Sequence, residues 1–382
     1  MRRYGHDRQP IQPDHARPAR RNPRSAAGII LGAALFALPL VAASEPRPGF
    51  VSTSLDLTNG SHAIRIGSDG LPVIAYLTES TAPDFSWGST VKVAHCEDLA
   101  CTVATLSEIA LSQDGASGAP RSFDGISLTI GPDGFPLISY IDLDGGLSVA
   151  HCADVACSSA TISPSLLSSY GPQRLSSPSM TIGSDGLGLI SVWNRHYQIL
   201  YVAHCEDADC STATISYAGN QAGGPGEITI GSDGLGIMSY VHVDGSLRTA
   251  HCQTANCTSS QGSIVDQTEG RRAGKWNSIT IGTDGLPLIA YESADVDGWE
   301  QMRVAHCNDV FCTSSTRTVV LGPSPGGSKD SPSIAIGADG LGVIAYYGQV
   351  GPGGQIGLGI THCSNVACEI WLIDGPSCLH AA

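Results

Sequence analysis

One phrase that returns six times along the chain constrains the fold more than any other feature of the sequence. The phrase is Ile-Gly-x-Asp-Gly, and its first glycine recurs about every 54 residues between Gly67 and Gly337. The six copies occupy residues 66–70, 130–134, 182–186, 230–234, 281–285 and 336–340. Repeats of this length are single supersecondary units that bury their apolar faces only against their neighbours, so the sequence predicts a propeller, a solenoid or an array.

Each repeat is predicted to contain four antiparallel strands. Apolar residues alternate or run continuously for four to seven residues, as in the segments 278–281, 286–291 and 302–307, and they never follow the helical period. The Asp-Gly pair between the first two segments predicts a tight hairpin, because glycine accepts the positive φ that the turn requires. Four strands in about 50 residues are typical of a propeller blade.

The sequence therefore predicts an all-β chain, a six-bladed β-propeller of four-stranded antiparallel blades over residues 61–376, followed by a tail at 377–382. The repeats begin near residues 61, 125, 178, 226, 277 and 332. The 46 glycines and 22 prolines agree with a turn-rich fold without long helices.

A second repeated phrase, Ala-His-Cys or Thr-His-Cys, carries a cysteine that is followed by another cysteine five positions later. Strands that face each other across a hairpin bring such a pair within reach of a disulfide, so we expect one bridge per blade. The pairs are Cys96 with Cys101, Cys152 with Cys157, Cys205 with Cys210, Cys252 with Cys257, Cys307 with Cys312 and Cys363 with Cys368. The alternative, six zinc sites, needs further ligands and a reducing compartment. Cys378 is left over and is either free or a bridge between two chains.

The repeats resemble those of secreted bacterial β-propellers, in the broad company of the sialidase-like (BNR) and lectin propellers. The resemblance covers nearly all of the chain after the leader, and it implies the fold rather than an activity. The sialidase repeat box Ser-x-Asp-x-Gly-x-Thr-Trp is absent, and His-Cys-x-x-x-x-Cys occupies the turn between the third and fourth strands instead.

The first 43 residues are predicted to be a secretory signal peptide. Seven Arg and two Asp precede or flank an apolar run from Ala26 to Ala43, which ends in small residues before Ser44. The alternative is an uncleaved membrane anchor. Residues 44–60 contain a surplus strand, 50–57, that we expect to latch the ring shut by adding to an edge; an incomplete seventh blade is the alternative. The predicted location is secreted, periplasmic or cell-surface.

The net charge of the chain limits the classes of partner that it can bind. Removal of the first 43 residues leaves 13 basic and 33 acidic residues, a net charge of −20. Such a surface repels nucleic acid, and the three lysines of the chain form no polybasic patch for anionic lipid. Neutral sugars, cations and basic proteins remain as partners, and no membrane insertion is expected after leader cleavage.

The repeated histidines are predicted to be structural. Each stands in step with apolar residues of the third strand, and we expect it to bond the Asp of the Gly-x-Asp-Gly turn. A catalytic dyad is the alternative, but six equivalent copies around a ring cannot converge on one substrate. The six are His95, His151, His204, His251, His306 and His362.

Function is expected where the repeats disagree, in the variable loops opposite the uniform turns. Aromatic side chains there suit sugar stacking or protein contact, whereas the alternative is that each Trp only covers its own loop. The candidates are Trp87, Trp193, Trp276 and Trp299.

Charged residues supply a second set of candidates. Arg65 stands where other repeats have Thr or Ala on the strand nearest the central channel, and its setting is similar to the first carboxylate-binding Arg of sialidases without their Arg-Ile-Pro motif. Glu227, Arg195, Tyr347 and Asp84 could complete such a site.

We predict a binding module for a glycan or a protein, with no catalytic residue assigned. The alternative is a sialidase-like glycoside hydrolase or a polysaccharide lyase acting in the channel. No phosphate loop, nucleophile elbow or zinc-protease motif is present, so no cofactor is expected. Calcium stays open, because 142–145 and 295–298 begin like calcium loops but lack the later ligands.

Overall fold

The computed structural model describes residues 61–81, 87–112, 125–142, 145–168, 175–267, 273–294, 297, 299–322, 329–349 and 356–369. All of them belong to the second of the two units into which the chain divides, residues 51–382. They form β-strands, turns and no helix. The predicted all-β fold class is confirmed, and the predicted leader, surplus strand and tail lie outside the described residues.

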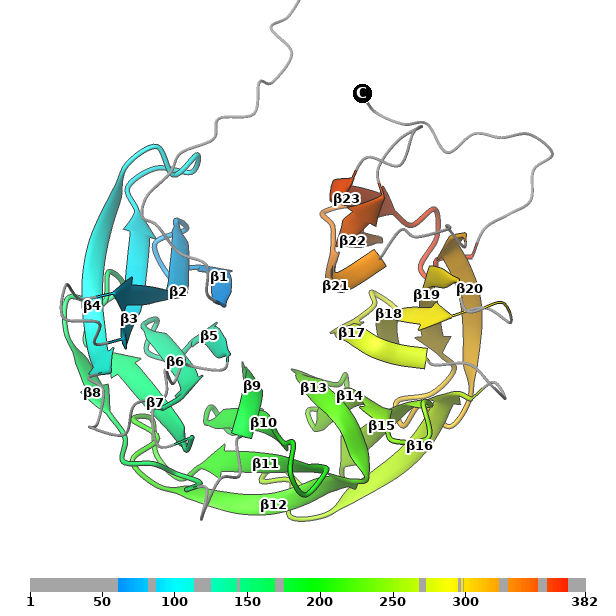
Figure 1. The fold of residues 1–382 in the computed structure, drawn as a ribbon, viewed down its shortest axis with the longest axis horizontal. Helices are drawn as coiled ribbons and strands as arrows, with labels where there is room; N and C mark the ends of the chain where they lie inside the picture. The colour runs from blue at the N-terminus through cyan, green and yellow to red at the C-terminus, as the bar shows by residue number, and fades with distance from the viewer. Residues whose placement is uncertain are drawn as a thin grey trace, which may run out of the picture. The chain divides into compact units, whose positions relative to one another are not determined.

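The strands are grouped into six antiparallel sheets in chain order, which are the six blades (Figure 1). Blades 1 to 3 consist of β1 (His62–Ile66), β2 (Pro72–Thr81), β3 (Trp87–Cys96), β4 (Ala104–Ser112); β5 (Ile126–Ile130), β6 (Pro136–Ile141), β7 (Leu147–Cys152), β8 (Ala160–Ile162); and β9 (Leu175–Ile182), β10 (Gly188–Asn194), β11 (Ile199–Cys205), β12 (Ala213–Asn220). Blades 4 to 6 consist of β13 (Ala222–Ile230), β14 (Gly236–His242), β15 (Leu247–Cys252), β16 (Ser260–Asp266); β17 (Ala273–Ile281), β18 (Pro287–Ala294), β19 (Glu300–Cys307), β20 (Ser315–Leu321); and β21 (Lys329–Ile336), β22 (Gly342–Gln349), β23 (Ile356–His362).

Blade 6 has three strands among the described residues. Residues 370–376, the part of the predicted propeller that follows β23 and its Cys loop, lie outside them. The inner strands of blades 3 to 6 begin three or four residues before the predicted repeat starts, and each has a register shift near that beginning. A bulge therefore lengthens these strands at the end where the chain enters the blade.

The hydrophobic core consists of five clusters, and each cluster takes side chains from two consecutive blades. In the cluster between blades 5 and 6, for example, Leu288 and Val304 of blade 5 pack with Ile344 of blade 6. We call these blade-to-blade interfaces seams. The alternation of each strand places one set of side chains in the seam before the blade and the other in the seam after it.

The repeated turn between the first two strands has the conformation that its glycine requires. In blade 1 the Gly70 amide donates to the Gly67 carbonyl (3.0 Å), the Gly67 amide donates to the Leu71 carbonyl (2.8 Å), and Gly70 has φ +83°. The corresponding glycines of the other blades have φ between +79° and +86°. The motif is a type I turn that ends in a left-handed glycine, longer than a two-residue hairpin.

The Cys-x-x-x-x-Cys loop between the third and fourth strands is closed by a disulfide in every blade, as predicted, with Cα–Cα distances between 4.6 and 4.8 Å. The bridges join Cys96 to Cys101, Cys152 to Cys157, Cys205 to Cys210, Cys252 to Cys257, Cys307 to Cys312 and Cys363 to Cys368. The alternative of six zinc sites is thereby replaced by covalent pairs within the blades.

The backbone at the second cysteine of each loop was not expected from the sequence. This residue has a left-handed conformation, with φ of 51° at Cys101, 54° at Cys157, 53° at Cys210, 52° at Cys257, 54° at Cys312 and 53° at Cys368. A residue other than glycine rarely adopts such a φ, and the repetition in six blades shows that the loop itself imposes it. The left-handed residue reverses the chain so that the fourth strand can begin.

The Cys loop is also shaped by an aspartate from inside. In blade 1 the Asp98 carboxylate accepts from the amides of Ala100 (2.9 Å) and Thr102 (3.1 Å). Hydrogen bonds from Thr102 hold the pKa of Asp98 below its ordinary value.

No described segment is a helix long and apolar enough to cross a membrane.

Non-reducing peptide mapping of the purified protein should find six within-blade bridges. The double variant with Cys205→Ser and Cys210→Ser should lower the free energy of unfolding by about 2 kcal/mol, because the closed loop is short and removes little entropy from the unfolded chain. Its far-UV circular dichroism should match the parent. Bridges between different blades would contradict the blade assignment itself.

Candidate functional site

Each blade presents two different ends to solvent. One end carries the Gly-x-Asp-Gly turn and the Cys loop, and turns of successive blades contact each other there; the Ser232 hydroxyl, for instance, donates to the Gly285 carbonyl of the next blade (2.7 Å). We call this end the turn face. The other end carries the hairpin between the second and third strands and the connection to the next blade, and we call it the loop face.

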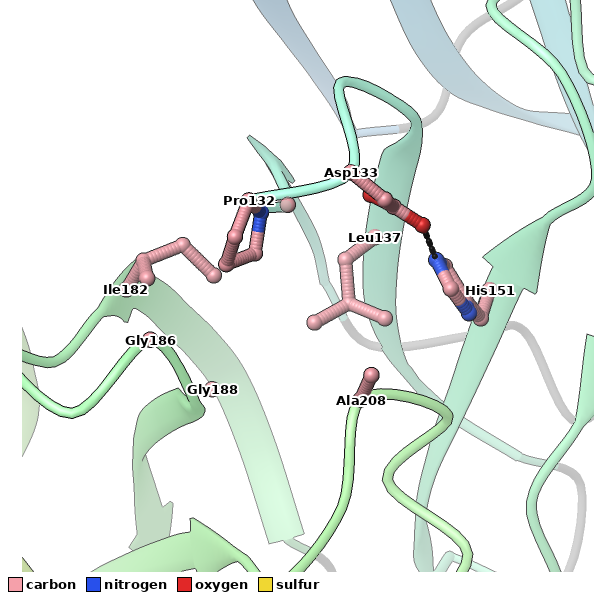
Figure 2. Close-up of a pocket in the computed structure, with 9 residues that line it drawn as sticks. Pro132, Asp133, Leu137, His151, Ile182, Gly186, Gly188 and Ala208 are labelled. Atoms are coloured by element: carbon pink, nitrogen blue, oxygen red, sulfur yellow. Dashed lines mark hydrogen bonds and ion pairs between the residues drawn. The ribbon is translucent and has the colours of Figure 1, made fainter.

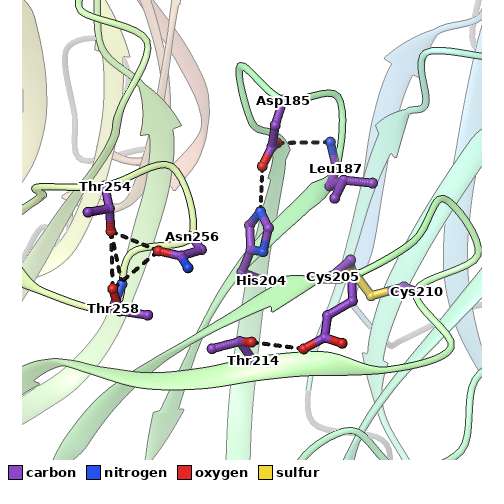
Figure 3. A network of polar contacts seen from close by, with 10 residues as sticks. Asp185, Leu187, His204, Cys205, Cys210, Thr214, Thr254, Asn256 and Thr258 are labelled. Carbon is purple, nitrogen blue, oxygen red and sulfur yellow. Dashed lines mark hydrogen bonds and ion pairs between the residues drawn. A yellow bond between two sulfur atoms is a disulfide. The ribbon is translucent and has the colours of Figure 1, made fainter.

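On the turn face, the His of the third strand lies against the Asp of the turn in every blade. Figure 3 shows the pair in blade 3, where His204 bonds Asp185 beside the Cys205–Cys210 bridge. The Nε2–Oδ2 distances are 2.7 Å for His95–Asp69, 2.8 Å for His151–Asp133, 2.7 Å for His204–Asp185, 3.0 Å for His251–Asp233, 2.7 Å for His306–Asp284 and 2.9 Å for His362–Asp339. The other carboxylate oxygen of the Asp accepts an amide of its own turn, such as Leu187 (3.1 Å). In blades 1, 2, 3 and 5 this contact is a hydrogen bond that ties strand and turn together. In blade 4 the ring nitrogens of the buried His251 have no hydrogen-bond partner among the described residues, although Asp233 lies 3.0 Å away.

The six pairs differ in what the next blade places beside the imidazole. His151 also lies 2.6 Å from the carboxylate of Asp209, in the Cys loop of blade 3. His251 instead packs its ring against Phe311, with centroids 4.6 Å apart. The fourth residue of the Cys loop therefore reaches the histidine of the preceding blade, and it varies from seam to seam.

On the loop face, the turn 195–198 of blade 3 is shaped by Asn194. The Asn194 side-chain oxygen accepts from the amides of His196 (3.1 Å) and Tyr197 (3.0 Å), and this leaves Tyr197 exposed. Trp193 lies half-buried at the strand end and donates from its indole N–H to the Ala222 carbonyl of blade 4 (3.0 Å). The Arg195 guanidinium lies 5.9 Å from the centroid of its ring. Trp193 therefore joins blades 3 and 4 through a hydrogen bond, and its ring also lies near the positive charge of Arg195.

Other aromatic side chains of the loop face are open to solvent. Trp276 in the bulge of β17 is 40% exposed, and Trp299 just before β19 is 43% exposed. The candidate Tyr347 is 55% exposed, but it pairs with Leu358 on the side of blade 6 that no described blade covers, and the equivalent Leu77 and Ile141 are buried in seams. Trp87 begins β3, and its side chain lies outside the described residues, as does Asp84. Tyr197 was not among the predicted candidates, because this variable turn has no counterpart in the other repeats with which the aromatic residue could be compared.

Glu227 occupies a position on the inner strand where three other blades use serine to bond the next blade. The hydroxyls of Ser127, Ser179 and Ser278 accept the amides of Met180 (3.0 Å), Ile228 (3.2 Å) and Ile334 (3.3 Å). In blade 4 the Glu227 carboxylate accepts the corresponding amide, that of Ile279, and also the hydroxyl of Ser278. Glu227 thus uses a carboxylate to make the contact with the next blade that a serine hydroxyl makes in blades 2, 3 and 5.

Glu227 is exposed by its solvent-accessible surface, although many protein atoms lie around its carboxyl group. This desolvation raises the pKa of Glu227, while the two hydrogen bonds and the charge of Arg65 act in the opposite direction. Arg65 is exposed on β1 and donates to the carbonyl of Ile64 (2.8 Å). The two charged candidates of the inner strands therefore interact through their charges, and no hydrogen bond between them is recorded in the described part of the chain.

Known proteins share the fold of this chain without sharing its sequence. No protein-family model matches the chain, and neither does any curated protein sequence. Among solved structures, a protein of unknown function from Dyadobacter fermentans is 13% identical, with a TM-score of 0.51, over 78% of this chain and 93% of its own. The NanB sialidase of Streptococcus pneumoniae is 9% identical, with a TM-score of 0.50, over 75% of this chain and 64% of its own.

The chain is a six-bladed β-propeller. The similarity to NanB agrees with the resemblance of the repeats to sialidase-like propellers, and at this level of identity it shows the fold alone.

Within the described ranges, no group of three or more His, Cys, Asp or Glu side chains is arranged to hold a metal ion. Asp142, at the start of one calcium-like segment, accepts the Gly146 amide (2.8 Å) and the Ser148 hydroxyl (2.9 Å) through its two oxygens. Residues 143–144, 295–296 and 298 of the two calcium-like segments lie outside the description.

The structural role of the histidines can be measured. His204→Ala should lower the free energy of unfolding by about 1–3 kcal/mol, because it leaves the partner carboxylate without its bond. The matched control is His362→Ala, since the side chains of His362 and Asp339 are 48% and 50% exposed whereas that of His204 is 9% exposed. The control should lose clearly less. Equal losses in chemical denaturation would contradict a role for burial in this tie.

Glu227→Gln should change how stability depends on pH. The folded protein holds the Glu227 proton more tightly than the unfolded chain, so the parent loses stability as pH rises from the ordinary value of 4.5 through the raised folded pKa. The stability of the variant relative to the parent should therefore increase as the pH rises above 4.5, in denaturant titrations carried out up to pH 8. Glu97→Gln, at an exposed carboxylate of a Cys loop, is the control. A constant difference between Glu227→Gln and the parent across this range would refute the raised pKa.

Proposed function

We propose that this propeller is an exported carbohydrate-binding module whose ligand contacts the loop face. The observation that carries the proposal is the set of aromatic side chains exposed there, which differ between blades while the scaffold around them repeats. The set is Trp276, Trp299 and Tyr197.

Aromatic rings at such positions match the chemistry of a sugar. A planar ring offers an apolar face to the C–H groups of a pyranose, and its rigid side chain loses little conformational entropy on binding. Trp193 with the Arg195 guanidinium beside it adds a hydrogen-bond donor near such a face. A protein ligand would use the same anchors, and a binding assay separates the two.

Charge and redox chemistry support export and a ligand that is not an anionic polymer. The chain has a net charge of −15, which opposes binding of nucleic acid and of strongly acidic polysaccharides. Six disulfides indicate an oxidising environment outside the cytoplasm.

A second candidate function is hydrolysis of a glycosidic bond among the inner strands. It is favoured by the raised pKa of Glu227, since a raised pKa is the shift that a carboxyl group acting as a general acid requires. Most glycosidases need two carboxyl groups. The groups that lower the pKa of Glu227 are the Ser278 hydroxyl, the Ile279 amide and Arg65, and none of these three is a carboxyl group. Turnover of a sialoside or polysaccharide that is lost in Glu227→Gln would favour this function over binding alone.

The binding function predicts that Trp299→Ala and Trp276→Ala lose affinity without losing stability. A glycan array with the mature protein, with and without calcium, first identifies the sugar. Each substitution should then weaken binding by roughly 1–2 kcal/mol, by analogy with aromatic anchors of interfaces. Melting temperatures should stay near that of the parent.

Trp193→Ala is the contrasting variant, because its indole bonds Ala222 across a seam and its loss should lower the melting temperature. If Trp276→Ala and Trp299→Ala were destabilised while keeping full affinity, the rings would only cover their own loops. The inner-strand residues Arg65 and Glu227 would then be the next candidates.

A further inference from the structure

The seam between blades 2 and 3 contains a cavity on the turn face that the proposed function does not use. Its volume is about 180 Å³, larger than the voids that hold single waters in protein interiors. We call it the seam pocket (Figure 2). Its walls are mainly apolar and include Pro132, Leu137, Ile182 and Ala208, and its polar groups are Asp133 and His151.

Two sequence differences at this seam lie beside the seam pocket. The third residue of the Cys loop in blade 3 is Ala208, whereas larger side chains stand there in four of the other blades, namely Leu99, Val155, Val310 and Val366. In blade 2, a Val155 methyl fills the space over the preceding turn and lies 2.9 Å from where a Cβ on Gly67 would be. No side chain of the next blade lies so close to Gly131, the equivalent glycine beside the seam pocket, and the same holds for Gly231 and Gly282, which face the blades that carry Val310 and Val366.

The second difference is Pro132, which replaces a hydroxyl residue of the turn. At two other seams this residue bonds the next turn, through Ser232 to Gly285 (2.7 Å) and Thr283 to Gly340 (3.2 Å). Proline has no hydroxyl to donate, so the contact with Gly186 is made by ring carbons instead. The rim of the seam pocket is therefore apolar where the other two seams have a hydrogen bond.

The polar end of the seam pocket carries more negative charge than positive. The two ring nitrogens of His151 lie 2.8 Å from Asp133 and 2.6 Å from Asp209, and a neutral imidazole could donate to only one of them. Even with the ring protonated, two carboxylates and one imidazolium leave a net negative charge. Among the described residues, Asp133 accepts only from His151 and the Phe135 amide (3.1 Å), so its carboxylate has lone pairs left for a donor from a ligand.

We propose that the seam pocket binds an alkylammonium group, with the aliphatic chain against Pro132, Leu137, Ile182 and Ala208 and the ammonium at Asp133. An apolar cavity that ends in an excess of carboxylate suits a cation on a short hydrocarbon stem better than a neutral polar molecule or an anion. The same chemistry is offered by a free primary amine and by a lysyl side chain.

The test is a titration of the full mature protein with n-butylammonium, Nα-acetyl-lysine amide and 1-butanol, followed by isothermal calorimetry and by chemical shifts of labelled protein. The two cations should bind saturably, and 1-butanol should bind at least about tenfold more weakly, which corresponds to a loss of one ionic contact. Tighter binding of the lysine derivative assigns the site to a protein partner, and tighter binding of butylammonium assigns it to a free amine.

The chain itself supplies the substitutions that should close or neutralise the seam pocket. Ala208→Val introduces the residue that blades 2, 5 and 6 carry, and should lower cation affinity by about tenfold or more through loss of space. Ala255→Val, the same change in blade 4, is the control and should leave affinity unchanged. Asp209→Asn, which copies Asn256 of blade 4, should weaken binding by a few-fold and flatten its salt dependence.

Melting temperatures of all variants show whether they fold, and glycan binding on the loop face should be the same in each, so that a failure here is separate from a failure of the proposed function. The proposal is overturned if neither cation binds saturably, if 1-butanol binds as tightly as butylammonium, or if Ala208→Val folds and keeps the affinity of the parent.

Discussion

The scaffold depends on one constraint, which is that a single sheet cannot cover its own two faces. Equivalent residues of blades 5 and 6 show this, because blade 5 is followed by another described blade and blade 6 is not. Met302 and Val304 of β19 are fully buried because blade 6 packs on them, whereas the corresponding Leu358 and Ile360 of β23 are 72% and 66% exposed in the described part of the chain. Burial in this protein is therefore a property of the seam rather than of the blade.

Polar contacts divide between the two ends of the blades in a way that follows from this constraint. On the turn face they are repeated, since the Cys loop recurs in every blade and the His–Asp hydrogen bond recurs in blades 1, 2, 3 and 5. On the inner strands serine makes the seam contact in three blades, and Glu227 makes it in a fourth although its carboxyl group is desolvated there. The loop face has no such common requirement, and there side chains such as Trp299 differ between blades.

Much of the architecture could be predicted from sequence because the repeat reports the same information six times. The four strands of blades 1 to 5, the Asp-Gly turns and the disulfides were predictable from short-range patterns, and all are present in the described residues. The bulges at the starts of β13 and β17 were not, because they depend on packing across a seam. The seam pocket and the second carboxylate on His151 escaped prediction for the same reason, since Ala208 and Asp209 look ordinary until the preceding blade is placed beside them.

The short span of the disulfides has a consequence for how the chain acquires its bonds. With twelve cysteines the number of wrong pairings is very large, and a protein with long-range bridges must search among them by slow exchange. Here each cysteine has its native partner five residues away, and closing so short a loop is far faster than any encounter between distant segments. The correct bonds can therefore form one blade at a time as the chain emerges into an oxidising compartment, with little need for an isomerase.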